Sequence, residues 1–578
     1  SLGRLWLMAN PTSTLATKWE YYIQPAEQTP EVNAQLDDLI QARITEDGAT
    51  LNPESLTLLD PACGSGHILV EAYDLLRDIY LERGYRRQDI PRLILEKNLY
   101  GLDIDDRAAQ LAGFALLMKA RADDRRLFEQ AVALNVLALQ EAKGGSATEL
   151  YSALNAPQIS YPAVSQLVEI FEQAKTFGSL IQIPTELADA LPDLRREVEA
   201  VRGSGDMLGR NASETLLQLV TQAGVLAKRF DAVVANPPYM GSKYLNGALK
   251  NFANDVFPNS KSDLFAVSVE RCLRYLKRSG YAGFMTPFTW MFLSSFENFR
   301  HIIHGENTLQ SLIQPQYHTF FESAAVPICT FCLQAGCTPN FEASFIKLEQ
   351  FRGAELQAPR ALEAIRNTTV SWFYTAKPDS FSKVPSSPIA YWVPQKVINA
   401  FADHAPISVD SQAKQGLITG DNDRFLKLWQ EVDVNRFCWN ASSRQQAQTS
   451  GAKWFPFHKG GGFRKWYGNH AFIVNWENDG IELQNFVDSA GKLRSRPQSM
   501  DFYFLPGVTW TSVTISTFNS RFCSGGFIYS EPGPVLHNDS VDELMFLCAY
   551  LNSKPADDML QLIAPAMHFN QGHIGSLP

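Results

Sequence analysis

The chain has 578 residues, more than one hydrophobic core usually holds, so two or three domains are expected. It contains no run of eighteen apolar residues, so no transmembrane helix and no membrane partner are predicted. The net charge of −10 argues against a uniformly basic nucleic-acid-binding protein but allows a local basic cleft on an acidic body.

The eight cysteines lack regular spacing, which indicates a reducing compartment and a cytoplasmic protein. Cys329, Cys332 and Cys337 lie close together, but no second pair of ligands is near, so no metal site is predicted. The first residues, Ser1 to Trp6, resemble neither an initiator segment nor a signal peptide, and we expect sequence upstream of them.

From Thr57 to about Leu333, short apolar segments alternate with longer helical periods, the pattern of a doubly wound α/β sheet. The predicted strands are Thr57–Asp60, Asn98–Asp103, Asn135–Leu139, Phe230–Ala235, Tyr281–Thr286, Leu309–Ile313 and Val326–Leu333. The predicted helices are His67–Arg83, Asp105–Arg121, Lys261–Lys277 and Ser295–His304. Gly280 is expected to cap the third of these helices at its C-terminus.

Two segments depart from this rhythm. Residues 145–228 keep helical spacing and are rich in Leu, Ala, Gln and Glu, which predicts a helical insertion between two strands of the sheet. From about residue 385, aromatic residues, Gly, Asn and Pro become frequent and long helical periods disappear. We therefore expect one domain over residues 1–384 and a second, α+β domain over residues 385–578.

A glycine-rich turn, Asp60-Pro61-Ala62-Cys63-Gly64-Ser65-Gly66, follows the first predicted strand and precedes a helix. Small residues let the backbone approach a ligand closely. A carboxylate at the end of the strand would repel a pyrophosphate but would suit a ligand with an amino group, such as the methionine part of S-adenosylmethionine. The predicted cofactor contacts in this loop are Asp60, Ala62, Cys63, Gly64 and Gly66.

The second predicted strand ends in Asp103-Ile104-Asp105. An acidic residue at this place holds ribose hydroxyls in doubly wound folds, which makes Asp103 the candidate, with Ile104 beside it. Asp105 could instead cap the N-terminus of the next helix.

The most informative segment is Ala235-Asn236-Pro237-Pro238-Tyr239, at the end of an apolar strand. The prolines fix the backbone and expose carbonyl groups without competing N–H donors. The Asn236 side-chain oxygen and the Pro237 carbonyl can accept both hydrogens of one exocyclic amine, which frees the nitrogen lone pair for attack on a methyl group. Tyr239 can stack on a planar base.

The order of glycine loop, acidic second strand, Asn-Pro-Pro-Tyr and later domain resembles the gamma group of amino-methyltransferases that act on DNA. This resemblance implies a Rossmann-like fold that binds S-adenosylmethionine at the residues above and at Asn236, and methylation of adenine N6 in a flipped-out base. It also implies that Phe321 stacks on the base with Tyr239, and that Lys261–Phe265 line the adenine end of the cofactor pocket. The third motif of the group is weak here, because Asn135–Leu137 is followed by no acidic residue at the strand end. The aromatic–Thr–Pro motif of the group and a PD-(D/E)xK nuclease are not found.

More narrowly, Leu2–Met8, Asp60–Ile68, Asn98–Asp105, Gly416–Trp429 and Lys453–Tyr467 resemble the PglX family of methyltransferases from BREX phage-defence systems. Membership would imply an antiviral enzyme that marks host DNA and works with other defence proteins. The methyltransferase of a type IIG restriction-modification enzyme is the nearest alternative.

The segment Lys453–Tyr467 mixes basic and aromatic residues around three glycines, which suits contact with double-stranded DNA. The candidates for DNA contact in the predicted recognition domain are Lys459, Arg464, Lys465, Arg494 and Arg496. Because residues 570–578 resemble the end of one half of such a domain, more recognition sequence is expected after them.

Two other readings remain open. Asn-Pro-Pro-Tyr also serves methyltransferases that act on protein glutamine or on guanine N2 of RNA, although these usually lack a second domain of this size. A methyltransferase-like scaffold that binds DNA without catalysis is the non-enzymatic alternative, against which the intact Asn236 and Tyr239 argue.

Overall fold

The computed structural model describes residues 1–142, 145–204, 206–317, 326–514, 517–564 and 568–578. The chain divides into two compact units, Ser1–Asp379 and Ser380–Pro578, so the division lies slightly before the expected change at residue 385. Each unit is described by itself.

The first unit is built on a sheet that has nine strands in the described part of the chain, in the order β3-β2-β1-β4-β5-β7-β6-β8-β9. The strands are β1 (Leu58–Asp60), β2 (Leu99–Asp103), β3 (Asn135–Ala138), β4 (Phe230–Ala235), β5 (Leu276–Pro287), β6 (Thr308–Gln314), β7 (Ile328–Gln334), β8 (Ala343–Lys347) and β9 (Phe373–Ala376). Strands β1 to β5 are parallel to one another, whereas β7 is antiparallel to both β5 and β6. The predicted α/β sheet is confirmed.

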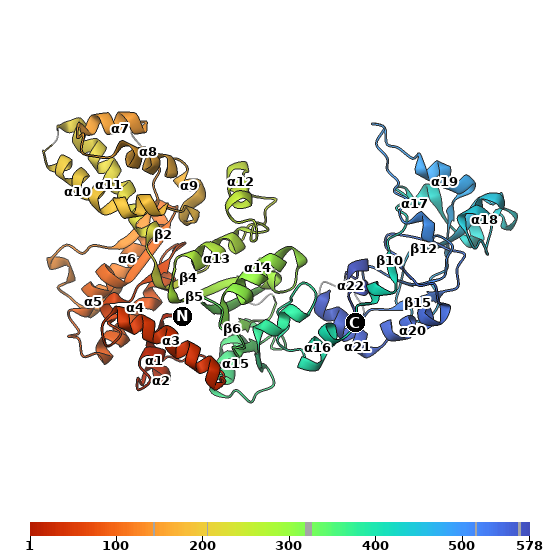
Figure 1. The fold of residues 1–578 in the computed structure, drawn as a ribbon, viewed down its shortest axis with the longest axis horizontal. Helices are drawn as coiled ribbons and strands as arrows, with labels where there is room; N and C mark the ends of the chain where they lie inside the picture. The colour runs from red at the N-terminus through yellow and green to blue at the C-terminus, as the bar shows by residue number, and fades with distance from the viewer. Residues whose placement is uncertain (143–144, 205, 318–325, 515–516, 565–567) are drawn as a thin grey trace. The chain divides into compact units, whose positions relative to one another are not determined.

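Helices connect and flank these strands (Figure 1). Outside the predicted insertion they are α1 (Leu2–Ala9), α2 (Leu15–Lys18), α3 (Pro30–Glu46), α4 (His67–Glu82), α5 (Ile90–Leu93), α6 (Asp106–Asp123), α12 (Gly247–Val256), α13 (Leu264–Arg274), α14 (Glu297–His301) and α15 (Ala354–Arg366). Asp105 accepts the backbone N–H groups of Arg107 and Ala108, at 2.7 and 3.2 Å, and so caps α6.

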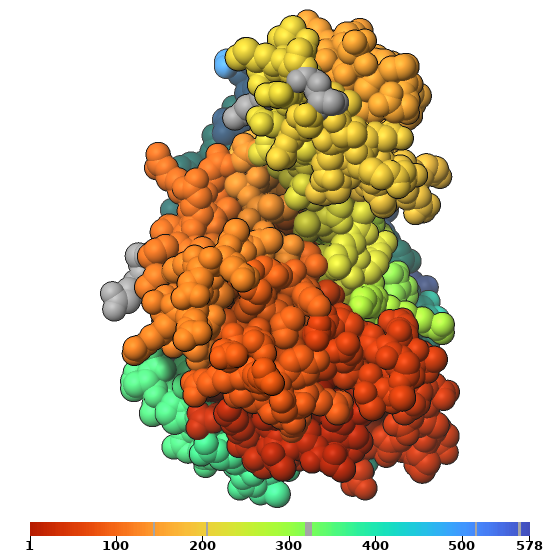
Figure 2. Space-filling view, turned by 90° about the vertical axis from the view of Figure 1, so that its left-hand side faces the viewer, coloured from red at the N-terminus to blue at the C-terminus, as the bar shows by residue number. Residues whose placement is uncertain are grey.

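The segment between β3 and β4 is helical. It contains α7 (Ala147–Leu154), α8 (Tyr161–Ile170), α9 (Ala174–Phe177), α10 (Thr185–Ser204) and α11 (Met207–Ala227). These helices gather next to the β2 end of the sheet in Figure 1 and form the yellow lobe at the top of Figure 2. Leucines repeat at helical spacing and are buried between the helices, for example Leu216 and Leu219 on α11.

The prediction that Gly280 caps a helix is wrong. Helix α13 ends at Arg274, and Gly280 lies within β5. Leu276 already pairs with Phe230 of β4, before a register shift that realigns Ala232 with Tyr281, so the backbone becomes extended earlier than the apolar pattern indicates. A β-carbon on Gly280 would lie 3.0 Å from the Phe230 carbonyl oxygen, so the glycine allows a close approach of two strands.

The second unit contains two four-stranded sheets in its described residues, β10-β17-β14-β15 and β11-β13-β12-β16. The strands are β10 (Gln412–Lys414), β11 (Leu426–Leu428), β12 (Trp454–His458), β13 (Phe472–Asn475), β14 (Gly507–Trp510), β15 (Ser520–Cys523), β16 (Ile528–Tyr529) and β17 (Val535–His537). The helices are α16 (Gln395–Asp403), α17 (Asn422–Phe425), α18 (Arg444–Thr449), α19 (Glu477–Gln484), α20 (Val541–Leu551), α21 (Lys554–Ile563) and α22 (Gln571–Gly575). Across the described residues of both units, we find no helix with the length and hydropathy that crossing a membrane requires.

A buried carboxylate joins four elements at the base of the first sheet. Asp231, at the start of β4, accepts from Arg43 Nε of α3 at 2.6 Å. It also accepts from the backbone N–H and hydroxyl of Thr57, just before β1, at 2.9 and 3.0 Å. Lys277 Nζ of β5 is 2.9 Å from its second oxygen. The side chains of Asp231 and Arg43 are each only 1% exposed, so the pair depends on these hydrogen bonds for its stability.

We predict that Asp231→Ala lowers the free energy of unfolding by about 3–5 kcal/mol, because the buried Arg43 guanidinium loses its most buried partner and keeps only Asp47 and Glu46, while Thr57 and Lys277 lose their acceptor. Urea unfolding of the first unit, followed by circular dichroism, measures this loss. Asp193→Ala is the control, because Asp193 is 69% exposed and pairs with Arg196 at the surface. A loss below about 1 kcal/mol for Asp231→Ala would contradict the prediction.

Candidate active site

The predicted site residues meet at one edge of the first sheet. Strand β1 is central: the chain passes from it to β2 and β3 on one side, and later to β4 and β5 on the other. Ligands bind at the carboxyl ends of parallel strands where the strand order reverses in this way. Asp60 ends β1, Asp103 ends β2 and Asn236 follows β4, so the three lie along the same edge.

The glycine loop packs tightly against its surroundings. Gly64 and Gly66 have positive φ angles of 51° and 87°. A β-carbon on Gly66 would lie 2.8 Å from Ala112 Cα of α6, so only glycine lets α4 begin this close to α6. The Cys63 N–H donates to the Leu102 carbonyl at 3.0 Å, which places the loop beside the end of β2.

Asp103 stabilises the glycine loop by accepting hydrogen bonds from backbone groups. Its carboxylate accepts from the backbone N–H of Gly64 and of Asp105, each at 2.9 Å. Each carboxylate oxygen can accept a further hydrogen bond, so Asp103 can hold hydroxyl groups as well. Of the two acidic residues considered from the sequence, Asp105 is the helix cap and Asp103 is the one that contacts the glycine loop.

Asp60 is a buried acid with few partners. It is 1% exposed and accepts one hydrogen bond, from Ala62 N–H at 3.2 Å. Burial, together with the nearby charge of Asp103, raises the pKa of the Asp60 carboxyl to about 7. A cationic group next to Asp60 would stabilise its ionised form. The site therefore suits a ligand that has a positively charged end and a hydroxylated end.

The predicted catalytic residues lie beside β5. Asn236 and Pro238 are exposed, whereas Pro237 is buried and Tyr239 is half-buried. The Tyr239 hydroxyl lies 2.8 Å from Asn236 Oδ1 and 3.2 Å from the Met285 carbonyl. Burial raises the pKa of Tyr239 to about 12, so the hydroxyl keeps its proton and can donate it. Asn236 Oδ1 retains a second lone pair for another donor.

More aromatic residues surround this end of β5 than the sequence analysis identified. Phe265 meets Tyr239 edge-on, with the ring centroids 6.3 Å apart. Phe288 follows β5 directly, and its ring lies 6.2 Å from that of Phe292 and 6.3 Å from that of Tyr317. Phe288 directly follows β5, which pairs with β4, the strand that ends before Asn236. This position after a strand could have indicated from the sequence that Phe288 lies near the candidate site. Phe321 lies outside the described residues.

The segment Lys261–Phe265 reaches the same region. Asp263 caps α13 by accepting from the Phe265 N–H at 3.2 Å, and it also accepts from the Met240 N–H at 3.0 Å. Asp263 therefore ties the residue after Tyr239 to the start of α13.

In the second unit, the five basic candidates differ in their surroundings. Arg464, Arg494 and Arg496 are exposed and have no carboxylate partner among the described residues. Lys465 Nζ donates to the Asn552 carbonyl at 2.8 Å, which occupies part of its hydrogen-bonding capacity. Lys459 Nζ lies 4.5 Å from the centre of the Phe472 ring.

One of these candidates, Lys459, borders a cavity of about 290 Å³. Lys459 lines it, and so does Ile418, whose backbone pairs with that of Arg496 at 2.8 and 3.0 Å. A β-carbon on Gly416 would lie 1.9 Å from the Tyr529 carbonyl oxygen, and one on Gly460 would lie 2.7 Å from the Pro532 carbonyl oxygen. Glycine at these two positions therefore allows a close approach of backbone segments next to the cavity.

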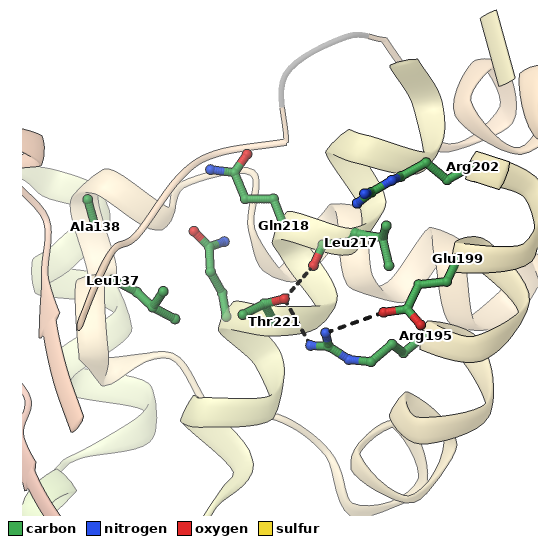
Figure 3. Close-up of a pocket in the computed structure, with 9 residues that line it drawn as sticks. Leu137, Ala138, Arg195, Glu199, Arg202, Leu217, Gln218 and Thr221 are labelled. Carbon is green, nitrogen blue, oxygen red and sulfur yellow. Dashed lines mark hydrogen bonds and ion pairs between the residues drawn. The ribbon is translucent and has the colours of Figure 1, made fainter. Parts of the chain in front are cut away.

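A second cavity, of about 280 Å³, lies between β3 and the helical insertion (Figure 3). In Figure 3, Leu137 and Ala138 face it from the strand, and Arg195, Glu199 and Arg202 face it from α10. The sequence analysis placed no functional residue here.

Comparisons with known proteins identify relatives of this chain. The profile of the Eco57I restriction-modification methylase matches residues 97–321. The adenine-specific methyltransferase BrxX of Escherichia coli O9:H4 (strain HS) is 40% identical over 602 residues, which cover 100% of this chain and 48% of that protein. The adenine-specific methyltransferase PglX of Lacticaseibacillus casei (strain Zhang) is 31% identical over 597 residues, with the same coverage. The chain thus spans about half the length of these two relatives.

A more distant relative is the type II restriction enzyme and methyltransferase RM.Eco57I of Escherichia coli, 23% identical over 51% of this chain and 26% of that protein. Among solved structures, the type IIL restriction-modification enzyme MmeI in complex with DNA aligns with a TM-score of 0.42 and 15% identity, over 94% of this chain and 61% of that one. A nuclease-deletion mutant of the type ISP enzyme LlaGI with a DNA substrate mimic aligns with a TM-score of 0.44 and 11% identity, over 94% and 46%.

The chain is therefore similar over its whole length to the adenine-specific methyltransferases BrxX and PglX, and its residues 97–321 match the profile of the Eco57I restriction-modification methylase.

Proposed function

We propose that the protein to which this chain belongs transfers a methyl group from S-adenosylmethionine to N6 of adenine in double-stranded DNA. The observation that carries this proposal is the position of Asn236-Pro237-Pro238-Tyr239 at the carboxyl end of β4, next to the glycine loop that follows β1. The similarity to two adenine-specific methyltransferases over the whole chain supports adenine as the target.

The residues at the sheet edge fit S-adenosylmethionine. The Asp60 carboxylate, whose pKa burial has raised, suits the ammonium group of the cofactor, and Asp103 suits its ribose hydroxyls. Ile104 is 48% exposed and offers an apolar surface to the adenine ring. When bound, the cofactor supplies an electrophilic methyl group on a sulfonium sulfur. We propose Ala62, Cys63, Gly64 and Gly66 as backbone contacts along the loop.

Asn236 and Pro237 prepare the nucleophile in this proposal. The Asn236 Oδ1 and the Pro237 carbonyl each accept one N6 hydrogen of the target adenine, which localises the nitrogen lone pair for attack on the methyl group. The Tyr239 hydroxyl holds Asn236 Oδ1 from the other side, at 2.8 Å, and fixes the direction in which the amide points. Pro238 stiffens the backbone between them.

The target base must leave the DNA helix to reach this edge of the sheet, because N6 is paired inside the duplex. We propose that the flipped adenine stacks on Tyr239, with Phe321 as the second aromatic. Stacking contributes roughly 1–3 kcal/mol per base, enough to offset much of the cost of unpairing.

The second unit is proposed to recognise the DNA sequence, with Lys459, Arg464, Lys465, Arg494 and Arg496 on the DNA side. The similarity to BrxX and PglX supports a role in BREX phage defence, in the cytoplasm and with other defence proteins as partners. The match to the Eco57I family favours the methyltransferase of a type IIG restriction-modification enzyme as the second candidate.

Asn236→Ala tests the mechanism. Loss of one acceptor on the amine should lower the single-turnover methylation rate by roughly 10²–10³-fold, by analogy with the loss of one hydrogen bond in other transition states. Binding of DNA and of the cofactor should change little. Transfer of labelled methyl groups to unmethylated DNA, RNA and protein measures both rate and substrate class. Asn211→Ala, at an exposed position of α11, is the control. A rate near that of the wild type, or transfer to protein or RNA instead of DNA, would overturn the proposal.

The raised pKa of Asp60 predicts that S-adenosylmethionine binds more weakly as the pH falls below 7. Free Asp60 takes up a proton in this range, whereas the bound cation favours the carboxylate, so binding must expel the proton. The dissociation constant should rise by up to about tenfold per pH unit between pH 7 and 5.5. Calorimetry on wild type and Asp60→Asn measures this, and the variant should show weak binding without that dependence. Equal wild-type affinities at pH 6 and pH 8 would refute the assignment.

Arg494 and Arg496 lack carboxylate partners among the described residues, so we expect them to contact DNA phosphates. Each replacement by Ala should reduce the slope of log binding constant against log salt by about 0.9, with a similar loss for all DNA sequences. Fluorescence anisotropy at several salt concentrations measures the slope. Arg424→Ala is the control, because Arg424 already pairs with Glu482 at 2.7 Å. An unchanged slope would show that Arg494 and Arg496 do not contact DNA phosphates.

A further inference from the structure

We propose that Trp466 is an aromatic wedge, which inserts between neighbouring base pairs of the DNA that the second unit binds. This inference rests on the proposed function and adds a second mode of recognition to it. The basic candidates contact phosphates and base edges in that proposal, whereas a wedge responds to how easily a base step opens. Trp466 belongs to residues 460–469, between β12 and β13, which we call the aromatic loop.

The aromatic loop exposes three large aromatic side chains, those of Phe463, Trp466 and Tyr467. The Tyr467 ring meets that of His470 edge-on, with the centroids 4.6 Å apart. Trp466 is 55% exposed, belongs to neither hydrophobic core cluster of the second unit, and contacts no other aromatic ring in the part of the chain that the structure describes. A tryptophan that contributes so little to the core is available to a ligand.

The backbone of Trp466 adopts a conformation that is unusual for a bulky residue. Its φ angle is +75°, in the left-handed region. The other residues of the loop with positive φ angles are types that tolerate this region, namely Gly460, Gly461, Gly468 and Asn469. A tryptophan at such a position costs conformational free energy that a glycine would avoid, and strain of this kind is concentrated where a side chain has a function.

Hydrogen bonds to β15 impose this conformation. The Trp466 N–H donates to the Ser520 carbonyl at 2.9 Å, and the Phe522 N–H donates to the Trp466 carbonyl at 3.0 Å. The backbone of Trp466 is thus paired on both sides of Arg521. The Arg521 side chain is buried, and its Nη1 donates to the Arg464 carbonyl at 3.3 Å. The loop is therefore held in place before any ligand binds, which lowers the entropy lost on binding.

The charge of the aromatic loop suits DNA as the partner. Residues 459–470 contain three basic residues and no acidic one, although the whole chain has a net charge of −10. Arg464 is exposed, and Lys465 keeps two of its three ammonium hydrogens after donating to the Asn552 carbonyl. Cations beside the ring can bind the phosphates that flank a base step, while the flat indole stacks on the bases.

The first test compares a fully paired duplex with the same duplex carrying one mismatched pair, because a mismatch lowers the cost of opening a base step. Fluorescence anisotropy on the 578-residue chain measures both affinities. The wild type should bind the mismatched duplex roughly tenfold more tightly, and Trp466→Ala should bring this ratio close to one. Trp466→Phe should retain most of the ratio, because it keeps an apolar ring. Trp429→Ala, at an exposed tryptophan outside the aromatic loop, is the matched control and should keep the wild-type ratio.

The second test separates a wedge from a structural tryptophan. Glycine adopts the φ angle of position 466 without strain. Trp466→Gly should therefore melt at or above the temperature of the wild type, and roughly 2–4 °C above that of Trp466→Ala, yet lose the preference for mismatched DNA. Scanning calorimetry without DNA measures the melting temperatures. If Trp466→Gly melts below the wild type, Trp466 is a packing residue of the fold and the wedge is overturned.

Tyr239→Ala distinguishes a wedge from base flipping, which also responds to a mismatch. It should leave most of the wild-type ratio in place. A ratio that falls in Tyr239→Ala but not in Trp466→Ala overturns this inference alone, as does a wild type that binds both duplexes equally. If the wild type binds neither duplex, the proposed function fails and this inference fails with it.

Discussion

The first unit depends on one buried carboxylate. Asp231 receives hydrogen bonds from α3, from the residue before β1 and from β5, while it belongs to β4 itself. An unpaired charge at this depth would be costly, so the burial of Asp231 couples the packing of these four elements. Five residues further along β4 the chain reaches Asn236. The position of β4 is therefore set at the end opposite to the proposed catalytic residues.

The candidate site residues at the carboxyl ends of β1, β2 and β4 are also held in place by hydrogen bonds and close packing. Asp103 accepts the Gly64 N–H, the loop packs on α6 through Gly66, and the Tyr239 hydroxyl occupies one lone pair of Asn236. Asp103, Gly66 and Asn236, which are proposed to contact substrate or cofactor, are each held by a neighbour. Such preorganisation means that little rearrangement is needed when a ligand arrives. The exception is Asp60, whose burial leaves its charge unstable until a cation is present.

Much of this site could be predicted from the sequence, because strand ends, glycine turns and prolines have local causes. Asp60, Asp103 and Asn236 are all found at strand ends, as their apolar neighbours indicate. The end of α13 could not be predicted, since it depends on pairing between Leu276 and Phe230, which are far apart in the chain. The basic candidates could be named but not ranked, because only the fold reveals that Lys465 is bonded to Asn552 while Arg494 is not.

The insertion between β3 and β4 also affects how the chain is made. The edge of β1 that pairs with β4 cannot be covered until residue 233 has been synthesised, long after β1, β2 and β3 have emerged. At roughly 5–20 residues per second, the segment between β3 and β4 delays that pairing by about 5–20 seconds. During this interval a nascent sheet of three strands has an open edge, the kind of surface that pairs wrongly with other chains. Helices α7 to α11 have local contacts and can fold meanwhile. The ribosome, and any chaperone beside it, thus encounters a half-sheet and a finished helical lobe before the catalytic strand exists.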